Sequence, residues 1–164
     1  MPVNRKPVQP VDITVLIRKF EQVIDTGKPI TAFALKLPRK NPRVLVRGDV
    51  IYVKGPRTTL RFTIGNSSAE KTNFYPTGIT FLLQSTEKVS RKDDCEITEE
   101  ERLGLLNFPQ RKFRYEGRTL SITDAYRDGK ETVRYKFSLL IQRGLDGAIG
   151  IIDPIIVHDN STPH

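Results

Sequence analysis

Few residues in this 164-residue chain carry the chemistry of a metal site or a nucleophilic catalyst. Cys95 is the only cysteine, which excludes an intrachain disulfide and a Cys-rich zinc or iron–sulfur site. A Ser-His-Asp or Cys-His arrangement needs a histidine held against its partners. His164 is the final residue, and His158 follows the last expected strand, where we predict a solvated side chain. The sequence therefore predicts no metal, no cofactor and no nucleophilic catalyst.

Carboxylates are the remaining candidates for catalysis, because two acids roughly 5 to 10 Å apart can hydrolyse glycosides. The candidates are Asp124, Asp128 and Asp153. No spacing singles them out, and Asp128 is better explained as part of the turn sequence Arg127-Asp128-Gly129-Lys130. A carbohydrate-active hydrolase is therefore the lowest-ranked hypothesis.

Positive charge is unevenly placed along the chain, whose formal net charge is +8. Residues 1–61 hold 13 Lys and Arg against 4 Asp and Glu, a net of +9, and residues 62–164 hold 14 against 15, a net of −1. Clustered cations attract phosphates and acidic surfaces. These cations are spread over several expected strands, however, which favours an ordinary solvated surface.

Two stretches combine cations with aromatic rings, as do sheets that bind single-stranded nucleic acid. The basic residues concerned are Arg57, Arg61, Arg111, Lys112 and Arg114. Phe62 and Phe113 alternate as core residues, so the pattern favours rings inside and arginines outside. Binding of nucleic acid or another polyanion, through the basic N-terminal third, is therefore the second hypothesis.

The elements that position these residues are predominantly strands. Leu60, Phe62 and Ile64 point one way while Arg61 and Thr63 point the other, the pattern of a sheet with one buried face. Similar segments recur between turn sequences. About eight or nine short strands are expected, which predicts an all-β sandwich or small barrel.

Two segments are less regular. Residues 12–24 fit either a helix capped by Asp12 or a strand, and we favour a strand through Ile17 because β-branched residues cluster there. A short helical insertion is expected near residues 98–106, where Thr98 begins a capping box. Three leucines are expected to dock this helix on the sandwich: Leu103, Leu105 and Leu106.

The domain organisation is simple. Residues 1–10, with three prolines and two basic residues, predict a flexible arm, and residues 11–160 predict a single β-sandwich domain. No secretory apolar region follows the arm, and no apolar run approaches the roughly 20 residues of a membrane-spanning helix. We therefore expect a soluble cytoplasmic protein.

The C-terminal third carries the most distinctive sequence. It runs Leu120-Ser-Ile-Thr-Asp124, Tyr135-Lys-Phe-Ser-Leu139, Asp146-Gly147 and Ile152-Asp153-Pro154-Ile155-Ile156. Over residues 50–157 the chain resembles small bacterial β-sandwich proteins of the DP-EP family, although it lacks the Glu-Pro pair. The resemblance implies an immunoglobulin-like or cupredoxin-like sandwich but no activity, because such folds host many functions.

A cupredoxin-like fold raises the question of copper, whose blue-copper sites use two His, one Cys and an axial Met. The available ligands are Met1, Cys95, His158 and His164. Met1 and His164 are the first and last residues, and Cys95 lies in an acidic stretch without a neighbouring histidine. No copper site is therefore expected.

The pair Asp153-Pro154 lies within the last expected strand, residues 148–157. Proline cannot donate a hydrogen bond to a β-ladder and suits an edge or terminal strand, where it discourages pairing with another chain. The Asp153 carboxylate could accept hydrogen bonds from nearby backbone amides. We therefore interpret Asp153 and Pro154 as a structural motif.

Together these patterns predict a non-enzymatic β-sandwich that acts through protein contacts. A protein partner or a second copy of the chain is the expected ligand, which makes the protein an interaction or self-association module.

Overall fold

The computed structural model describes residues 9–23, 31–54, 57–66, 72–86, 99–125 and 132–158. Several predictions fall outside these ranges: residues 1–8 of the arm, Cys95, Thr98, Asp128 and His164. Within the described residues, no helix is long and apolar enough to cross a membrane.

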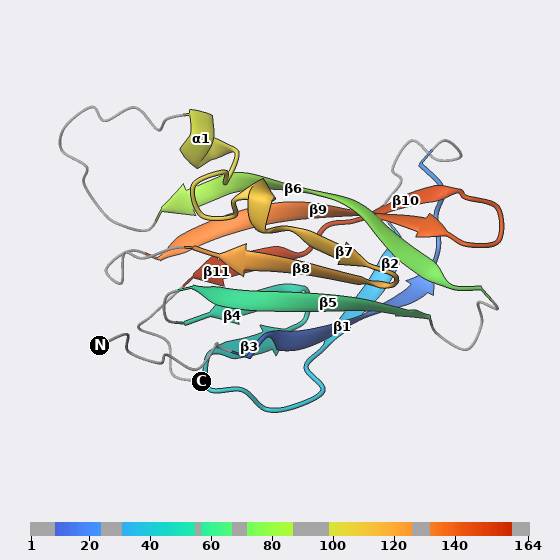
Figure 1. Ribbon diagram of the computed structural model, residues 1–164, viewed down its shortest axis with the longest axis horizontal. Helices are drawn as coiled ribbons and strands as arrows, with labels where there is room; N and C mark the ends of the chain where they lie inside the picture. The colour runs from blue at the N-terminus through green and yellow to red at the C-terminus, as the bar shows by residue number, and fades with distance from the viewer. Residues whose placement is uncertain are drawn as a thin grey trace, which may run out of the picture.

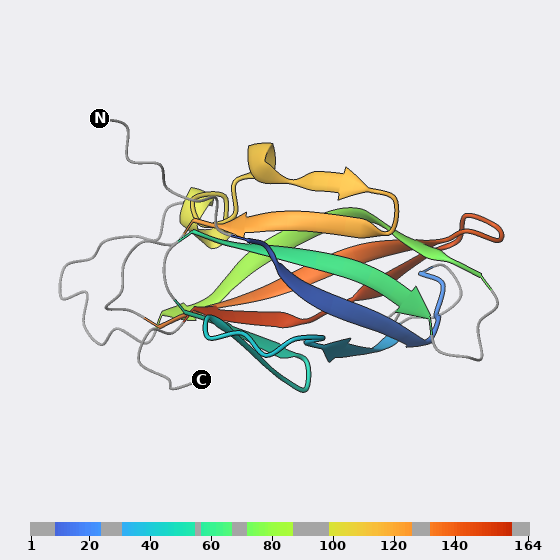
Figure 2. The same ribbon diagram turned by 60° about the horizontal axis from the view of Figure 1, so that its bottom comes forward.

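Two mixed β-sheets face one another across the core (Figures 1 and 2). The strands of the five-stranded sheet are, in spatial order, β2 (Ala32–Lys36), β1 (Val11–Lys19), β5 (Thr58–Asn66), β8 (Thr119–Asp124) and β7 (Arg114–Glu116). Neighbouring strands are antiparallel except β1 and β5, which run parallel.

The six-stranded sheet is organised around its longest pair, β6 and β9. Its strands are β6 (Phe74–Thr86), β9 (Val133–Arg143), β10 (Ile149–Ile152), β11 (Ile155–His158), β4 (Val50–Val53) and β3 (Val44–Arg47). Both β10 and β11 pair with β9, and β11 also pairs in parallel with β4. The described residues otherwise contain only the single helical turns α1 (Glu99–Arg102) and η1 (Gln110–Lys112), so the predicted all-β sandwich is confirmed.

The segment that fits both a helix and a strand forms β1. It lies between β2 and β5, with Val11 opposite Leu60 and Ile17 opposite Asn66. Val11, Ile13, Val15 and Ile17 are all buried and alternate with more exposed residues, which is the period of a strand with one face on the core. The predicted strand through Ile17 is confirmed, and it continues to Lys19.

Inward-facing residues of both sheets fill the core. β5 follows the alternation predicted from its sequence, with Leu60 and Phe62 fully buried. The Phe62 ring lies 5.7 Å from that of Phe137, which belongs to the opposite sheet. Contact between these two rings joins the layers near the middle of the sandwich.

The predicted helical insertion is shorter and docks differently. Leu105 and Leu106 are 38% and 59% exposed, so the prediction that they anchor the segment is wrong. Phe108 is 1% exposed instead and stacks on Phe81 with ring centroids 4.0 Å apart. Gly104, at φ 72°, lies so close to β6 that a Cβ there would meet the Phe81 Cβ at 2.7 Å. The chain therefore turns at this glycine and presents an aromatic ring to the core.

The described residues form eleven strands, more than the eight or nine expected. Part of the difference arises because residues 148–157 form two strands, β10 and β11. The register with β9 is the same on both sides of the break, since Ile152 pairs with Leu139 and Ile155 pairs with Lys136. At the break, the Phe137 N–H donates to the Pro154 carbonyl at 3.1 Å, and proline has no N–H to return.

Candidate functional site

The outer face of the six-stranded sheet is lined by apolar side chains. Ile152 and Ile156 are fully buried in the core, so alternation turns Ile151, Ile155 and Val157 to the outside. The same alternation in β3, β4 and β9 turns further apolar residues outward. We call this surface the apolar face, and its residues are Leu45, Val50, Tyr52, Leu140, Ile149, Ile151, Ile155 and Val157.

Cross-strand pairing makes the apolar face continuous. Leu45 pairs with Tyr52, and Tyr52 pairs with Val157, which gives one row across three strands. Val50 and Ile155 form the row beside it. Opposed side chains on neighbouring strands have Cβ atoms about 4.5–5.5 Å apart. The rows therefore form a single surface.

No described helix or strand packs on the apolar face. The two helical turns lie against β6 and β8, and the five-stranded sheet lies on the core side (Figure 2). Val157 is only 6% exposed, whereas the other residues of the apolar face are half-buried. The part of this face that an occupant can reach is therefore formed by the half-buried residues.

Basic side chains border the apolar face. On β9, Arg134 stands opposite Val157 and Lys136 opposite Ile155. On the other side of Ile155, the same row continues through Val50 of β4 to Arg47 of β3. None of the six strands of this sheet contains an Asp or Glu. Asp153, in the break between β10 and β11, pairs with Lys136, so Arg47 and Arg134 carry the positive charge of the rim that no described acid offsets.

Asp153 and Pro154 lie in the centre of this sheet. Pro154 directly precedes β11, the last strand of the chain, so of the two predicted positions it is terminal, whereas an edge position is wrong because β11 lies between β9 and β4. The Asp153 carboxylate accepts a hydrogen bond from the Ser138 hydroxyl at 2.7 Å and lies 3.7 Å from Lys136 Nζ. Its partners in the described residues are side chains and not the backbone amides expected. The motif lies at the break between β10 and β11, which together carry half of the residues of the apolar face.

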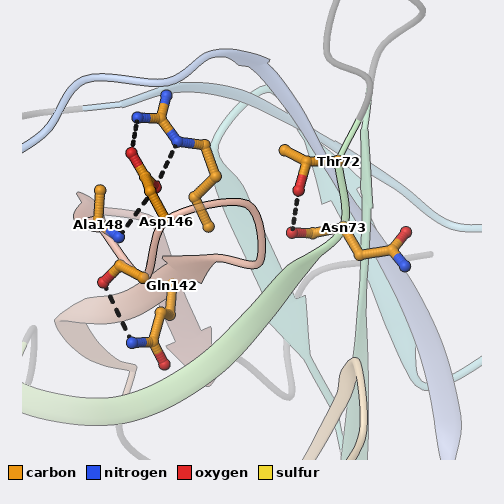
Figure 3. A network of polar contacts seen from close by, with 7 residues as sticks. Thr72, Asn73, Gln142, Asp146 and Ala148 are labelled. Carbon is orange, nitrogen blue, oxygen red and sulfur yellow. Dashed lines mark hydrogen bonds and ion pairs between the residues drawn. The ribbon is translucent and has the colours of Figure 1, made fainter.

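The turn between β9 and β10 is fixed by polar contacts (Figure 3). Asp146 accepts two hydrogen bonds from the Arg143 guanidinium, at 2.9 and 2.6 Å, and one from the Ala148 N–H at 3.1 Å. The Arg143 hydrogen bonds, then the Ala148 amide, lower the pKa of Asp146 from 3.8 to about 2. The Gln142 side-chain amide donates to the Gly147 carbonyl at 3.1 Å. These contacts set where β10 begins on the apolar face.

The outer face of the five-stranded sheet has a different chemistry. We call it the hydroxyl face, and its outward residues include Asp12, Thr14, Thr59, Arg61, Thr63, Thr119, Ser121 and Thr123. The hydroxyls of Thr59 and Thr123 lie 3.2 Å apart, and those of Thr63 and Thr119 lie 3.4 Å apart. This surface is typical of a sheet face that meets water.

Two of the five cations predicted for polyanion binding are engaged within the protein. Arg61 donates to both carboxylate oxygens of Asp12, at 2.5 and 3.1 Å. This side-chain hydrogen bond lowers the pKa of Asp12 and raises that of Arg61. Arg114 donates to the backbone carbonyls of Arg111 and Phe113, both at 2.9 Å. Neither arginine is presented as a free anion ligand.

The other three predicted cations lie together. Arg57, Arg111 and Lys112 line one pocket of about 310 Å³, with Pro109, Thr123 and Ala125. Only Arg57 belongs to the basic N-terminal third. Phe62, one of the rings considered for base stacking, is fully buried and is out of reach of a nucleic acid.

His158 is not solvated, which corrects the prediction from its place after the last expected strand. It closes β11, is 3% exposed, and its Nδ1 lies 2.9 Å from Oδ2 of the fully buried Asp124. His158 lies an even number of residues after Ile152 and Ile156, so the alternation of a strand places its side chain on the same, inward side. The pair joins β11 of one sheet to β8 of the other.

The two described acids among those considered for glycoside hydrolysis, Asp124 and Asp153, do not converge. Asp124 faces the core, whereas Asp153 belongs to the outer side of the opposite sheet. Within the described residues, no group of three or more His, Cys, Asp or Glu side chains is gathered as a metal site would require. The described residues thus offer the apolar face and the basic pocket as candidate binding surfaces, beside a smaller, mainly apolar pocket of about 190 Å³ between β6 and residues 103–113.

No protein-family model, curated protein or solved structure matches this chain. The resemblance to the DP-EP family stays a prediction, and the function is inferred from the surfaces that the fold presents.

Proposed function

We propose that the protein is a non-enzymatic module that binds another protein through the apolar face. The observation that carries this proposal is the set of contiguous apolar rows in outward positions. Strands with one solvated face alternate between apolar and polar residues, whereas near-continuous apolar runs are typical of strands covered on both faces. Residues 149–157 are of the second kind, yet no described element covers their outer side.

The centre of the apolar face has the composition of a protein interface. Tyr52 lies between Leu45 and Val157, so an aromatic ring with a polar tip is surrounded by aliphatic side chains. Tyrosine is enriched among the residues that dominate binding energy, and apolar anchors contribute most when they lie centrally and lose their water. Large continuous apolar surfaces on soluble proteins commonly mark such contacts.

The basic rim favours a partner that carries carboxylates around an apolar patch. Arg47 and Arg134 stand beside the apolar rows, while Lys136, between Ile155 and Leu82, is paired with Asp153. A second copy of the chain, docked face to face, would oppose the same cations, and like charges across an interface are unfavourable. We therefore favour an acidic partner over self-association.

The most suggestive chemical pair supports a binding role over catalysis. A carboxylate at histidine Nδ1 orients the ring in many hydrolytic enzymes. Asp124 and His158 have this geometry, but both lie in the core at 3% exposure or less. A substrate would have to open the sandwich to reach them.

A matched pair of lysine substitutions tests the proposal. Ile155→Lys places a charge on the apolar face, and Thr63→Lys places the same charge on the hydroxyl face. Each variant and the parent protein are immobilised, and proteins retained from a lysate of the host organism are quantified by mass spectrometry. We expect an acidic protein that the parent and Thr63→Lys retain and Ile155→Lys loses. Equal retention by all three proteins, or equal loss from both variants, would contradict the proposal.

Light scattering of the same three proteins separates the two classes of occupant. A partner-binding face predicts a monomer in every case. A dimer that Ile155→Lys alone dissociates would reassign the apolar face to self-association.

A further inference from the structure

The basic pocket is built from two segments that are distant in the sequence. Arg57 immediately precedes β5, and Arg111 and Lys112 belong to η1. The Ala125 N–H, at the end of β8, donates to the Asn107 carbonyl at 2.7 Å and holds the segment leading to η1 over the strand end. The tertiary fold, and not a run of basic residues, brings these three cations together.

No acidic side chain among the described residues compensates the positive charge of the pocket. Among the described residues, no ion pair involves Arg57, Arg111 or Lys112, whereas Arg61 on the same sheet is paired with Asp12. Three like charges around one concavity repel one another and raise its potential. A bound anion would relieve this repulsion.

The backbone at Arg57 points to the same place. Arg57 has φ 54° and is the only described non-glycine residue with a positive φ. This left-handed conformation is unfavourable for a residue with a long side chain and persists where surrounding structure imposes it. Glycine or asparagine would adopt it more readily. The sequence instead has an arginine here, whose side chain lines the pocket.

Guanidinium groups suit phosphate, because their parallel N–H donors match two phosphate oxygens and an ammonium group adds a third contact. Thr123, whose hydroxyl already contacts that of Thr59, adds a polar group to the pocket wall. The volume of about 310 Å³ lies at the lower end of the range for small-molecule sites, about 300–1,000 Å³.

We propose that this pocket binds the phosphate group of a small phosphorylated molecule. A nucleic-acid track would need cations continuing along a groove. The cations that would continue it, Arg61 and Arg114, are engaged with Asp12 and with backbone carbonyls. The site is therefore compact and self-contained, and it is independent of the apolar face.

Calorimetric titration of the full chain tests the proposal with four probes: inorganic phosphate, adenosine monophosphate, glucose 6-phosphate and a single-stranded oligonucleotide of twelve residues. We expect saturable binding of one phosphate-bearing small molecule per chain. The relative affinities of the first three probes show whether the free ion, a nucleotide or a sugar phosphate is preferred. No saturable binding of any of these three would overturn the proposal, as would binding of the oligonucleotide with higher affinity than all three.

Arg57→Asn is the most informative variant, because asparagine tolerates the left-handed backbone while removing the charge. We expect phosphate affinity to fall about tenfold, the usual effect of losing a charge-assisted hydrogen bond. The thermal midpoint should stay the same or rise, so that loss of binding cannot be attributed to misfolding. Arg118→Asn, at the far end of β8, removes one positive charge outside the pocket and should leave the affinity unchanged. Equal effects of the two variants on affinity would overturn the proposal.

Discussion

The apolar face and the hydroxyl face are built on strands of the same geometry, on opposite sides of one core, and they differ in what their outward positions carry. On β5 the inward Leu60, Phe62 and Ile64 alternate with outward Thr59, Arg61 and Thr63. On β10 and β11 the outward positions are aliphatic as well, and the exceptions, Gly150 and His158, are both inward. The core requires only the inward set. The outward aliphatic set therefore calls for a separate explanation, and we assign it to partner binding.

The largest difference between inward and outward positions should appear in neighbouring isoleucines of β11. Ile156→Ala removes a fully buried side chain and should lower the free energy of unfolding by about 2–5 kcal/mol. Ile155→Ala, on the apolar face, should lower it by about 1 kcal/mol, because its side chain is only half-buried in the free protein. Urea unfolding of both variants measures the two values. Equal losses would show that the outer face is covered within the chain itself.

The buried Asp124 and the outward Asp153 should differ in how much they contribute to stability. Asp124→Ala leaves the buried His158 Nδ1 without this partner and should cost about 1–3 kcal/mol of unfolding free energy. Asp153→Ala removes a carboxylate from the outer side of the sheet, where the Ser138 hydroxyl can turn to water, and should cost less than about 1 kcal/mol. Chemical denaturation at pH 7 provides both numbers. A larger loss for Asp153→Ala would mean that its contacts within the six-stranded sheet stabilise the fold more than the buried Asp124–His158 contact does.

Loss of a hydroxyl contact on the hydroxyl face should lower the free energy of unfolding by less. Thr59→Val keeps the β-branched shape but removes the hydroxyl contact with Thr123, which should cost at most about 1 kcal/mol. Thermal unfolding measures the change, with Thr63→Val as a second test of the contact with Thr119. A loss above about 2 kcal/mol in either variant would show that this face is more than a solvated surface.

The turn that begins β10 predicts the smallest effect, and one that depends on pH. Arg143 and the Ala148 amide hold the folded-state pKa of Asp146 at about 2, below its usual 3.8. A depressed pKa contributes stability that is fully present above pH 3.8 and is lost as the pH falls through about 2. The thermal midpoint of Asp146→Asn should therefore lie slightly below that of the parent at pH 7 and equal it near pH 2. A difference that does not change with pH would contradict this assignment.

Local patterns predicted the strands well because alternation is a property of neighbouring residues. β5 formed as its sequence indicates, and β1 formed as a strand because its β-branched residues meet β5 and β2. The docking of residues 103–108 was not predictable in the same way. It depends on the close approach of Gly104 to Phe81. These two residues belong to different segments, and the spacing of residues within one segment does not predict how it packs on another.

The candidate site was only partly predictable, for the same reason. The sequence marked five cations, but it could not show that Arg61 meets Asp12, 49 residues earlier, across a parallel pair of strands. It also could not show that Arg57 joins Arg111 and Lys112 in a pocket. His158 was detectable in principle, but the proline break in its strand obscured the alternation that turns it inward.

Site-specific photo-cross-linking in the host cell tests the central claim most directly. A photoreactive phenylalanine analogue is placed at Ile151 on the apolar face and, separately, at Ser121 on the hydroxyl face. We expect irradiation to produce a discrete adduct of higher mass only from position 151, containing one acidic protein. Adducts of equal yield from both positions, or an adduct from position 121 alone, would contradict the assignment of the apolar face as the binding surface.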